Sequence, residues 1–247
     1  MNNKLALRMI EDITEDYYSH FCGLKLSELR SGIFFVPSEE RDSTLAGQGC
    51  KYTMYILAKD NVCAVSYSPK YSNIFENMKK RSANEIIMET NRQFKLKKMK
   101  LMTFEKETVF DYGNAQILCA KDYPLFEAFF RAMHPNADPS GWLKEYFAEK
   151  TDKEYFSGYF SDNKLVSVCD APDMPYMQGI VQHTGISTLV GERKKGYARR
   201  TLALAVHHLI QNGICPQYEC DADNTASFSL ALSVGFKEYG TAYILKE

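Results

Sequence analysis

The chain lacks the features that mark several protein classes. Its seven cysteines are an odd number and form no Cys-x-x-Cys pair, which argues against a disulfide framework or a zinc site and favours reduced thiols. No apolar run is long enough to cross a bilayer, and acidic residues occur too early for a secretory signal. The net charge of −1 differs from the strongly basic domains of nucleic-acid platforms. We therefore expect a cytoplasmic protein with no membrane, metal or nucleic-acid partner.

What is present is ordinary globular composition over 247 residues, enough for one large or two modest domains. The most informative stretch is Arg193-Lys194-Lys195-Gly196-Tyr197-Ala198. A β-branched run over 180–188 predicts a strand before it. From Tyr197 onward, apolar residues recur at the spacing of an amphipathic helix that ends near Gly213. The stretch is therefore a strand-to-helix turn.

The start of a helix attracts anions, because its first N–H groups are unpaired and lie at the positive end of the helix dipole. The small residues Gly196 and Ala198 let the backbone approach a bulky diphosphate. Counter-charge comes from basic side chains on both sides, namely Arg193, Lys194, Lys195 and Arg199. The hexapeptide alone indicates a diphosphate site or a solvated basic helix start, and it does not decide between them.

A second element follows in the chain. Residues 215–221 read as a short strand, and Asn224 or Thr225 can cap a helix that runs to Val234. Gly235 provides a left-handed stop with Phe236 as its hydrophobic partner. Residues 237–245 supply a last strand.

The two elements together resemble the GNAT superfamily of N-acetyltransferases. Its first hallmark, Arg or Gln followed by x-x-Gly-x-Gly/Ala, matches residues 193–198. Its second, an Asn, a small residue three positions on, then Leu and a terminal Gly-Phe, matches Asn224, Ser227, Leu230 and Gly235-Phe236. Both occur in the family's order, separated by one helix and one strand, over roughly the C-terminal half.

The resemblance implies an α/β fold of the α+β type, with a mixed, splayed sheet flanked by helices. It also implies a site for acetyl-CoA, in which strands 180–188 and 215–221 diverge to admit the thioester. The strand backbone would pair with the pantetheine arm, residues 194–199 would hold the pyrophosphate, and Asn224 would lie near the pantetheine or the thiol end. The implied cosubstrate-binding residues are Ile186, Ser187, Thr188, Arg193, Lys194, Lys195, Gly196, Tyr197, Ala198, Arg199, Asn224 and Ser227.

The catalytic groups are less clear from the sequence. Many family members carry a Tyr that protonates the leaving thiolate one residue after the Leu of the second hallmark, and that position here is Ala231. Tyr239 or Tyr243 can serve instead, or the thiolate leaves unassisted. The candidate bases are Glu219 and His183, although a lone His on a strand is more often structural. Asp221 reads as a turn cap, and Cys220 as a nucleophile is disfavoured because the family transfers the acetyl group directly.

Residues 1–116 carry neither hallmark, and we expect a smaller N-terminal α/β domain there, followed by a GNAT domain over 117–247. A degenerate second copy of the fold in the first half is left open. The basic stretch 92–100 reads as a helix face or connector. Residues 104–119 read as a strand pair around a turn at 112–114. The loop 170–177 can meet a cationic acceptor or be plain surface.

The sequence thus predicts an acetyl-CoA-dependent N-acetyltransferase that acetylates a primary amine of a small molecule directly and requires no metal. A non-catalytic acyl-CoA-binding or regulatory module is the alternative, and an unrelated α/β binding domain is a third interpretation. The identity of the amine, the oligomeric state (a homodimer included) and the role of residues 1–116 are left open.

Overall fold

The structure of the protein is a computed structural model that describes residues 5–107 and 111–247. Seven α-helices are present in this part of the chain: α1 Leu7–Cys22, α2 Ser72–Glu76, α3 Ala83–Phe94, α4 Tyr123–Met133, α5 Leu143–Asp152, α6 Tyr197–Gln211 and α7 Thr225–Val234. The strands of the first half are β1 Gly32–Pro37, β2 Tyr52–Lys59, β3 Val62–Tyr67 and β4 Lys97–Phe104. Those of the second half are β5 Ala115–Ile117, β6 Ser157–Ser161, β7 Lys164–Asp170, β8 Val181–His183, β9 Gly185–Thr188, β10 Cys215–Asp221 and β11 Phe236–Lys246.

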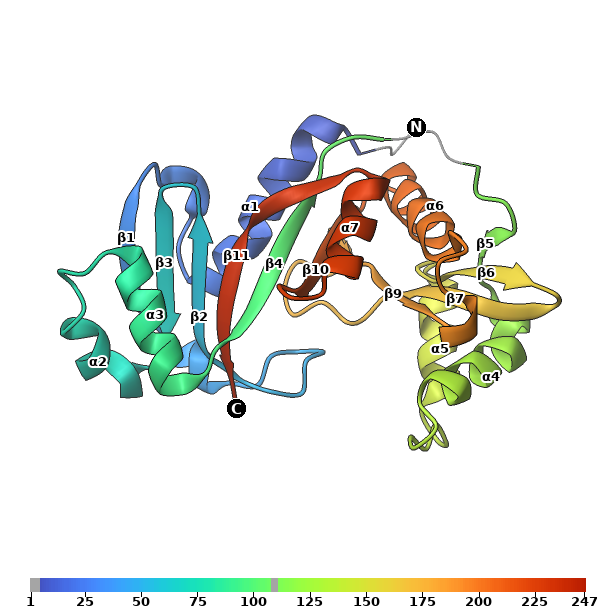
Figure 1. Cartoon of the computed structure of the whole chain (residues 1–247), viewed down its shortest axis with the longest axis horizontal. Coiled ribbons are helices and arrows are strands. Elements are labelled where there is room, and N and C mark those ends of the chain that lie inside the picture. The colour runs from blue at the N-terminus through green and yellow to red at the C-terminus, as the bar shows by residue number, and fades with distance from the viewer. Residues whose placement is uncertain (1–4, 108–110) are drawn as a thin grey trace.

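The strands form two sheets. A seven-stranded mixed sheet has the order β1-β3-β2-β11-β4-β10-β8, and a four-stranded antiparallel sheet has the order β5-β6-β7-β9. In Figure 1 the strands of the larger sheet run from the left to the centre, and the smaller sheet lies at the right with α4 and α5. The mixed α/β class with helices flanking a splayed sheet is confirmed.

The division between the sheets falls inside one stretch of chain. The predicted strand 180–188 is interrupted at Thr184, whose N–H and hydroxyl both donate to the carbonyl of Gln217, at 2.9 and 3.0 Å. Before this residue β8 pairs in parallel with β10, and after it β9 pairs with β7. Strands β9 and β10 therefore diverge, and a space opens between them.

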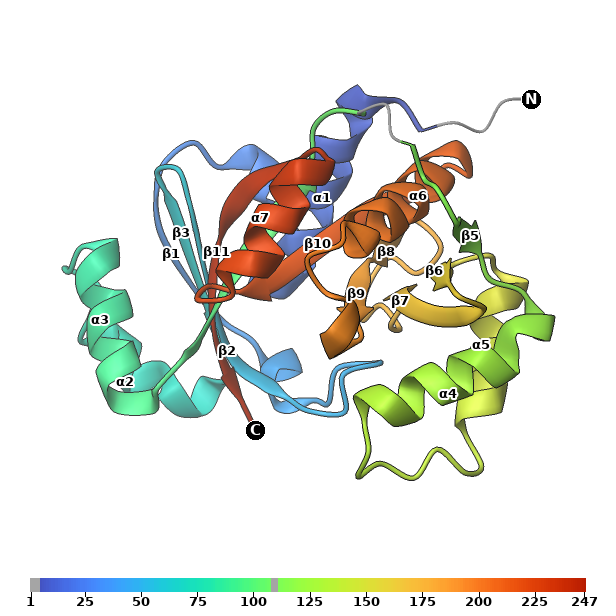
Figure 2. The ribbon, with the colours of Figure 1, turned by 45° about the vertical axis from the view of Figure 1, so that its right-hand side comes forward.

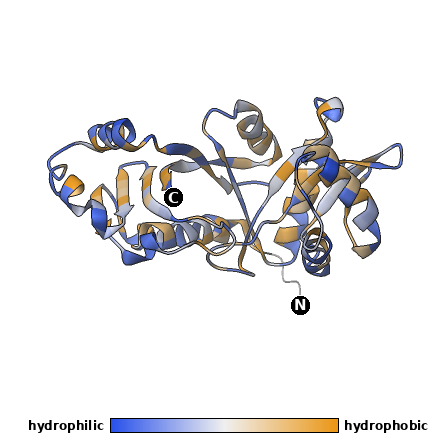
Figure 3. Ribbon diagram, turned by 90° about the horizontal axis from the view of Figure 1, so that it is seen from below, coloured by the Kyte–Doolittle hydropathy of each residue, from blue (hydrophilic) through white to orange (hydrophobic). Residues whose placement is uncertain are grey.

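Three apolar clusters hold the layers together. Helices α1, α6 and α7 pack with β4, β10 and β11, helix α3 packs on β2 and β3, and helices α4 and α5 pack on β6 and β7. Figure 2 shows α7 and α1 on opposite sides of the larger sheet. In Figure 3 hydrophobic stretches recur along the strands, and hydrophilic stretches recur in the peripheral loops and helices. The amphipathic pattern of α1 and α6 is the sequence signal for this packing.

Strand β4 corrects two predictions about the middle of the chain. Helix α3 ends at Phe94, and residues 97–104 form a strand between β11 and β10 instead of a helix face or connector. The expected strand pair within 104–119 is also wrong, because β5 pairs with β6 and not with β4. Part of that stretch, residues 108–110, lies outside the described residues. In both cases the strand is decided by a pairing partner that is distant in the chain, and a local sequence pattern does not reveal that partner.

Because β4 comes from the first half of the chain, strands on both sides of residue 116 share one sheet. The boundary at 116 stays a prediction. We expect a fragment of residues 117–247 to lose cooperative thermal unfolding, since it exposes the edges of β10 and β11 and loses the fully buried residues Leu101, Met102 and Thr103. Circular dichroism melting and gel filtration measure this.

The matched control is a fragment of residues 97–247, which retains β4 and is expected to unfold more cooperatively than the shorter one. A shorter fragment that melts as sharply as the whole chain contradicts the expectation.

Candidate acyl-donor and acceptor site

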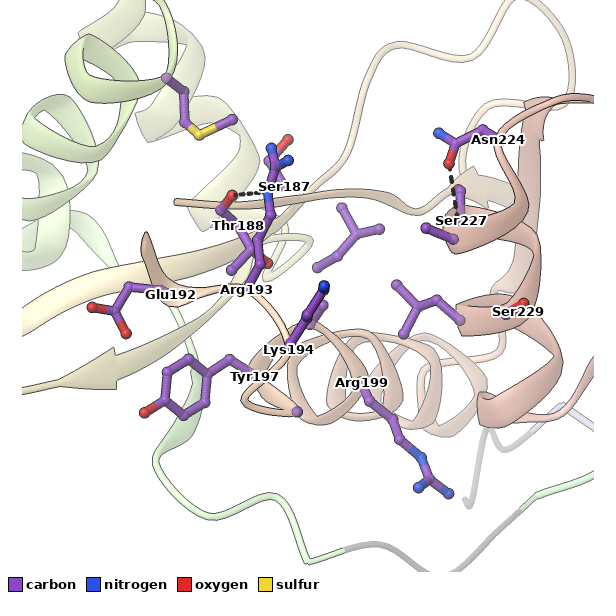
Figure 4. Close-up of a pocket in the computed structure, with 16 residues that line it drawn as sticks. Ser187, Thr188, Glu192, Arg193, Lys194, Tyr197, Arg199, Asn224, Ser227 and Ser229 are labelled. Carbon is purple, nitrogen blue, oxygen red and sulfur yellow. Dashed lines mark hydrogen bonds between the residues drawn. The ribbon is translucent and has the colours of Figure 1, made fainter. Parts of the chain in front are cut away.

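A cavity of about 710 Å³ lies between β9, the start of α6 and one face of α7. Figure 4 shows Thr188, Glu192 and Arg193 on one wall and Asn224, Ser227 and Ser229 on the other. Of the predicted cosubstrate-binding residues, all except Lys195 line it. The side chain of Lys195 instead bonds Glu192, with Nζ 2.8 Å from Oε2, and this ion pair raises its pKa.

The turn before α6 has the backbone conformation of an anion cradle. Lys194 and Gly196 both adopt positive φ, of 64° and 82°, next to the first helical residue, Tyr197. Among the described residues, no backbone carbonyl accepts the N–H groups of residues 194–198. When left-handed residues alternate with residues of negative φ, successive N–H groups point toward one position, which favours an anion there. Glycine suits position 196 because L-residues rarely adopt this φ.

Each side of the cradle is held by a short-range bond. The Nε of Arg193 donates to the carbonyl of Thr188 at 3.2 Å, which ties the turn to the end of β9. The side chain of Asn224 accepts the N–H of Ser227 at 3.0 Å and caps α7, as one of the two predicted options. The stop of α7 at Gly235 is also observed, and a Cβ there would lie 2.1 Å from the carbonyl oxygen of Lys106.

A smaller cavity of about 260 Å³ adjoins the first at the divergence of β9 and β10. The two share the lining residues Ile186, Asn224 and Ser227. The residues that line the smaller cavity also include Glu219, Asp221, His183 and Tyr218. A long ligand can therefore enter along α7 and reach polar groups of β10.

Glu219 lies on the face of β10 that meets α1. The hydroxyl of Tyr18 donates to its carboxylate at 3.0 Å. Burial raises the pKa of Glu219, although the Tyr18 hydrogen bond and the charges of Lys246 and Lys97 oppose this. A carboxyl group with a raised pKa that lines a cavity has the character of a general base.

His183 has a different environment. Its Nε2 accepts the backbone N–H of Glu219 at 3.2 Å, and its Nδ1 is buried without a partner among the described residues. Burial lowers its pKa to about 4, so the ring is neutral at physiological pH. If β8 continued alongside β10, it would accept the N–H of Glu219. The imidazole of His183 accepts this N–H instead, and it thereby helps to hold β9 and β10 apart.

Other candidates from the sequence are placed as follows. Cys220 lines the smaller cavity, and burial raises the pKa of its thiol. Asp221 pairs with Lys97, with Oδ1 2.7 Å from Nζ. Ala231 is fully buried in the core, and neither Tyr239 nor Tyr243 lines either cavity.

The loop 170–177 is partly used for structure. Asp173 forms an ion pair with the buried Lys150, and the hydroxyl of Tyr176 accepts a hydrogen bond from Arg41 at 3.1 Å. Asp170 is the last residue of β7, and burial raises its pKa.

Sequence reasoning missed several residues of the site. The sequence pattern around Tyr218 indicates only a strand, whereas in the structure its hydroxyl lies 2.7 Å from the Oγ of Ser227. The further lining residues of the larger cavity are Met133, Glu192, Ala226, Ser229 and Leu230. The spacing of the small residues on α7 was an available signal, since positions three and four apart share a helix face.

Two absences concern only the described residues. Their helices include none with the length and apolar composition of a membrane span. Their His, Cys, Asp and Glu side chains include no group of three or more that could hold a metal ion.

Comparisons with known proteins agree with this geometry. The model of the family described as GNAT acetyltransferase matches residues 31–245. A GNAT-family acetyltransferase from Colwellia psychrerythraea has a similar structure (TM-score 0.52, 14% identity, covering 74% of this chain and 77% of that one). A GCN5-related N-acetyltransferase from Sphaerobacter thermophilus is also similar (TM-score 0.52, 15% identity, covering 68% and 57%). Among curated proteins, none matches the sequence. At these identities the solved structures show a shared fold.

Proposed function

The chain belongs to the GNAT acetyltransferase family, and we propose that it transfers an acetyl group from acetyl-CoA directly to a primary amine of a small molecule. The observation that carries the proposal is the pair of adjoining cavities. The larger has a cradle of backbone N–H groups, and the smaller contains a partly buried carboxylate. The two cavities would form one path, with a diphosphate at one end and the reacting amine at the other.

For the donor, the free N–H groups of residues 194–198 suit the pyrophosphate, and the exposed side chain of Lys194 adds positive charge. Within the described chain no strand pairs with the edge of β9 opposite β7, so the pantetheine amides can pair with it as an added strand. The Thr188 carbonyl is already used, because it accepts the Nε of Arg193. A backbone N–H near Ile186 is then placed to stabilise the oxyanion that develops on the thioester carbonyl.

For the acceptor, the acidic smaller cavity suits an ammonium group. Glu219 takes a proton from the ammonium, directly or through water, and the free amine attacks the thioester carbonyl. Holding both substrates in the diverging space supplies part of the rate by proximity. Cys220 has no role as an acyl carrier, because its raised pKa keeps the thiol protonated.

We assign His183 a positioning role instead of the role of base. Its Nε2 lone pair is already used by the N–H of Glu219, and a pKa of about 4 makes it a weak proton acceptor at neutral pH. It fixes the backbone of β10 at Glu219, a residue that lines the smaller cavity.

The alternative is a non-catalytic acyl-CoA-binding module. The buried Ala231 favours it, because no Tyr is available at the position where many relatives protonate the thiolate. Both functions require acetyl-CoA binding, and only the enzyme requires turnover.

The first test is thermal stability with acetyl-CoA. A ligand that binds only the folded state at about 100 times its Kd stabilises it by about 2.7 kcal/mol, which for a chain of this size raises Tm by roughly 5–10 °C. Differential scanning fluorimetry measures the shift, with desulfo-CoA as a positive control for cradle binding. An unchanged Tm over a wide range of acetyl-CoA concentrations would overturn both functions.

The second test is release of free thiol from acetyl-CoA with a panel of primary amines. Amine-dependent release by the wild-type protein supports the enzyme. Binding without release across amino acids, polyamines, aminoglycosides and arylalkylamines would favour the binding module.

A further inference from the structure

Two hydroxyl groups meet at the junction of the cavities. The Oη of Tyr218, on β10, lies 2.7 Å from the Oγ of Ser227, on the first turn of α7. Tyr218 lines the smaller cavity, and Ser227 lines both. Tyr218 is buried, with 2% exposure, whereas Ser227 is partly exposed where it lines the cavities.

Ser227 is held in place by its neighbours. Its N–H bonds the side chain of Asn224, which caps α7. Of the described residues that line both cavities, Ser227 is the one with a hydroxyl, the others being Ile186 and Asn224. Ser227 is therefore the hydroxyl-bearing residue at the junction of the two cavities.

Transfer of an acetyl group creates negative charge at this junction. When the amine displaces CoA, the carbon–sulfur bond breaks and its electron pair goes to sulfur. A sulfur atom near Ile186 and Ser227 then has the neutral hydroxyl of Ser227 as its neighbour. The tyrosine positions considered from the sequence do not supply a donor there, since residue 231 is a buried Ala and both Tyr239 and Tyr243 lie outside the cavities. Hydrogen bonds to charged groups are stronger than those between neutral groups.

We propose that Ser227 and Tyr218 form a thiolate-stabilising pair, in which the Ser227 hydroxyl donates to the departing sulfur and the Tyr218 hydroxyl donates to the Ser227 oxygen. This inference rests on the proposed function and names a catalytic residue, Ser227, and a positioning residue, Tyr218. No proton needs to cross the pair, since the thiolate is a stable product with a pKa near that of other thiols, about 8.5, and takes its proton from solvent after release.

The environment of Tyr218 suits this role. Burial raises its pKa to about 12, so the phenol keeps its proton throughout the physiological range and remains a donor. The ring stacks on His183, with centroids 6.3 Å apart, and packs against Phe236. These contacts hold the hydroxyl toward Ser227.

The direct test measures the ionisation of CoA bound to the protein. Thiolate absorbs in the ultraviolet, so a pH titration of the CoA complex against the desulfo-CoA complex gives the pKa of the bound thiol. We expect it to lie about one to two units below that of free CoA. Ser227→Ala should remove most of the shift, and Ser227→Thr should retain it. Ser233→Ala, on the same helix but outside both cavities, should leave it unchanged.

Kinetics provide the second readout. We expect Ser227→Ala to lower kcat about tenfold or more with the KM for acetyl-CoA changed less than about threefold, and Tyr218→Phe to have a smaller effect of the same kind. Tyr239→Phe should leave kcat unchanged. The Tm of Tyr239→Phe is the reference for the effect of losing a tyrosine hydroxyl on stability, because the hydroxyl of Tyr239 is buried and lacks a partner among the described residues.

The outcomes separate this inference from the proposed function. Failure of CoA to bind would overturn the proposed function. Binding and turnover by the wild type, with a bound thiol that titrates as free CoA does or with an unchanged kcat in Ser227→Ala, would overturn the thiolate-stabilising pair alone.

Discussion

Replacing Glu219 with Gln is expected to lower kcat/KM by about 10² to 10⁴-fold, the usual contribution of a positioned general base. Glutamine keeps the size of the side chain and can still accept the Tyr18 hydroxyl, which now lies 3.0 Å from the carboxylate. It cannot take a proton from the acceptor. Steady-state thiol release measures the loss.

The pH profile gives a second readout of the same substitution. Because burial raises the pKa of Glu219, wild-type kcat/KM should fall as the pH drops through a value above the ordinary pKa of Glu. Glu219→Gln should lack this acidic limb. An unchanged limb in the variant would assign the base to another residue.

Glu219→Gln should lower activity but should not lower the thermal stability of the folded protein. A group whose pKa is raised by folding contributes stability below its unfolded pKa and loses it as the pH rises through the folded pKa. Ionisation of Glu219 therefore costs the folded protein stability. Glu219→Gln should have at least the wild-type Tm at pH 7, with the difference disappearing in acid.

Glu238→Gln is the matched control for charge and size. Glu238 lies on β11, pairs with Lys100 and lines neither cavity. Its substitution should leave kcat/KM within about twofold, since surface ion pairs contribute little.

The second large effect is expected at the cradle. Ala198→Glu should weaken acetyl-CoA binding roughly 100-fold, because it places a negative charge and extra bulk beside the N–H groups of residues 194–198. Fluorimetry or calorimetric titration with acetyl-CoA measures the change in Kd.

This substitution should not destabilise the fold. An acidic side chain in the first turn of a helix interacts favourably with the helix dipole, so the Tm of the free protein should be unchanged or slightly higher. The control is Asn84→Glu, at the same second helical position of α3 and exposed to solvent. Equal acetyl-CoA affinity in Ala198→Glu and Asn84→Glu would refute the cradle.

Much of the second half of the molecule was predictable from local patterns. The predicted bounds of β10, residues 215–221, agree with the structure, as do the helix after Gly196 and the cap of α7 by Asn224. Glycine, asparagine and helical periodicity act over a few residues, so the sequence reports them directly. The same signals brought together eleven of the sixteen residues that line the larger cavity.

The first half was less predictable because its decisive contacts are long-range. The lysines of 97–100 read as a solvated face, yet this segment is the start of a strand between β10 and β11. Its apolar end, Leu101 to Phe104, is buried by helices and strands distant in the chain. Propensity does not choose a partner for a strand.

The same distinction applies to the site. The sequence by itself determined the turn from Gly196 into α6, because the positive φ of this glycine and the helix start that follows depend on neighbouring residues. Only the tertiary structure decided the contacts at the divergence of β9 and β10. The bond from Glu219 N–H to His183, the contact of Tyr18 with the Glu219 carboxylate and the pairing of Tyr218 with Ser227 join separate elements. Burial, which lowers the pKa of His183 and raises that of Glu219, exists only once those elements have packed.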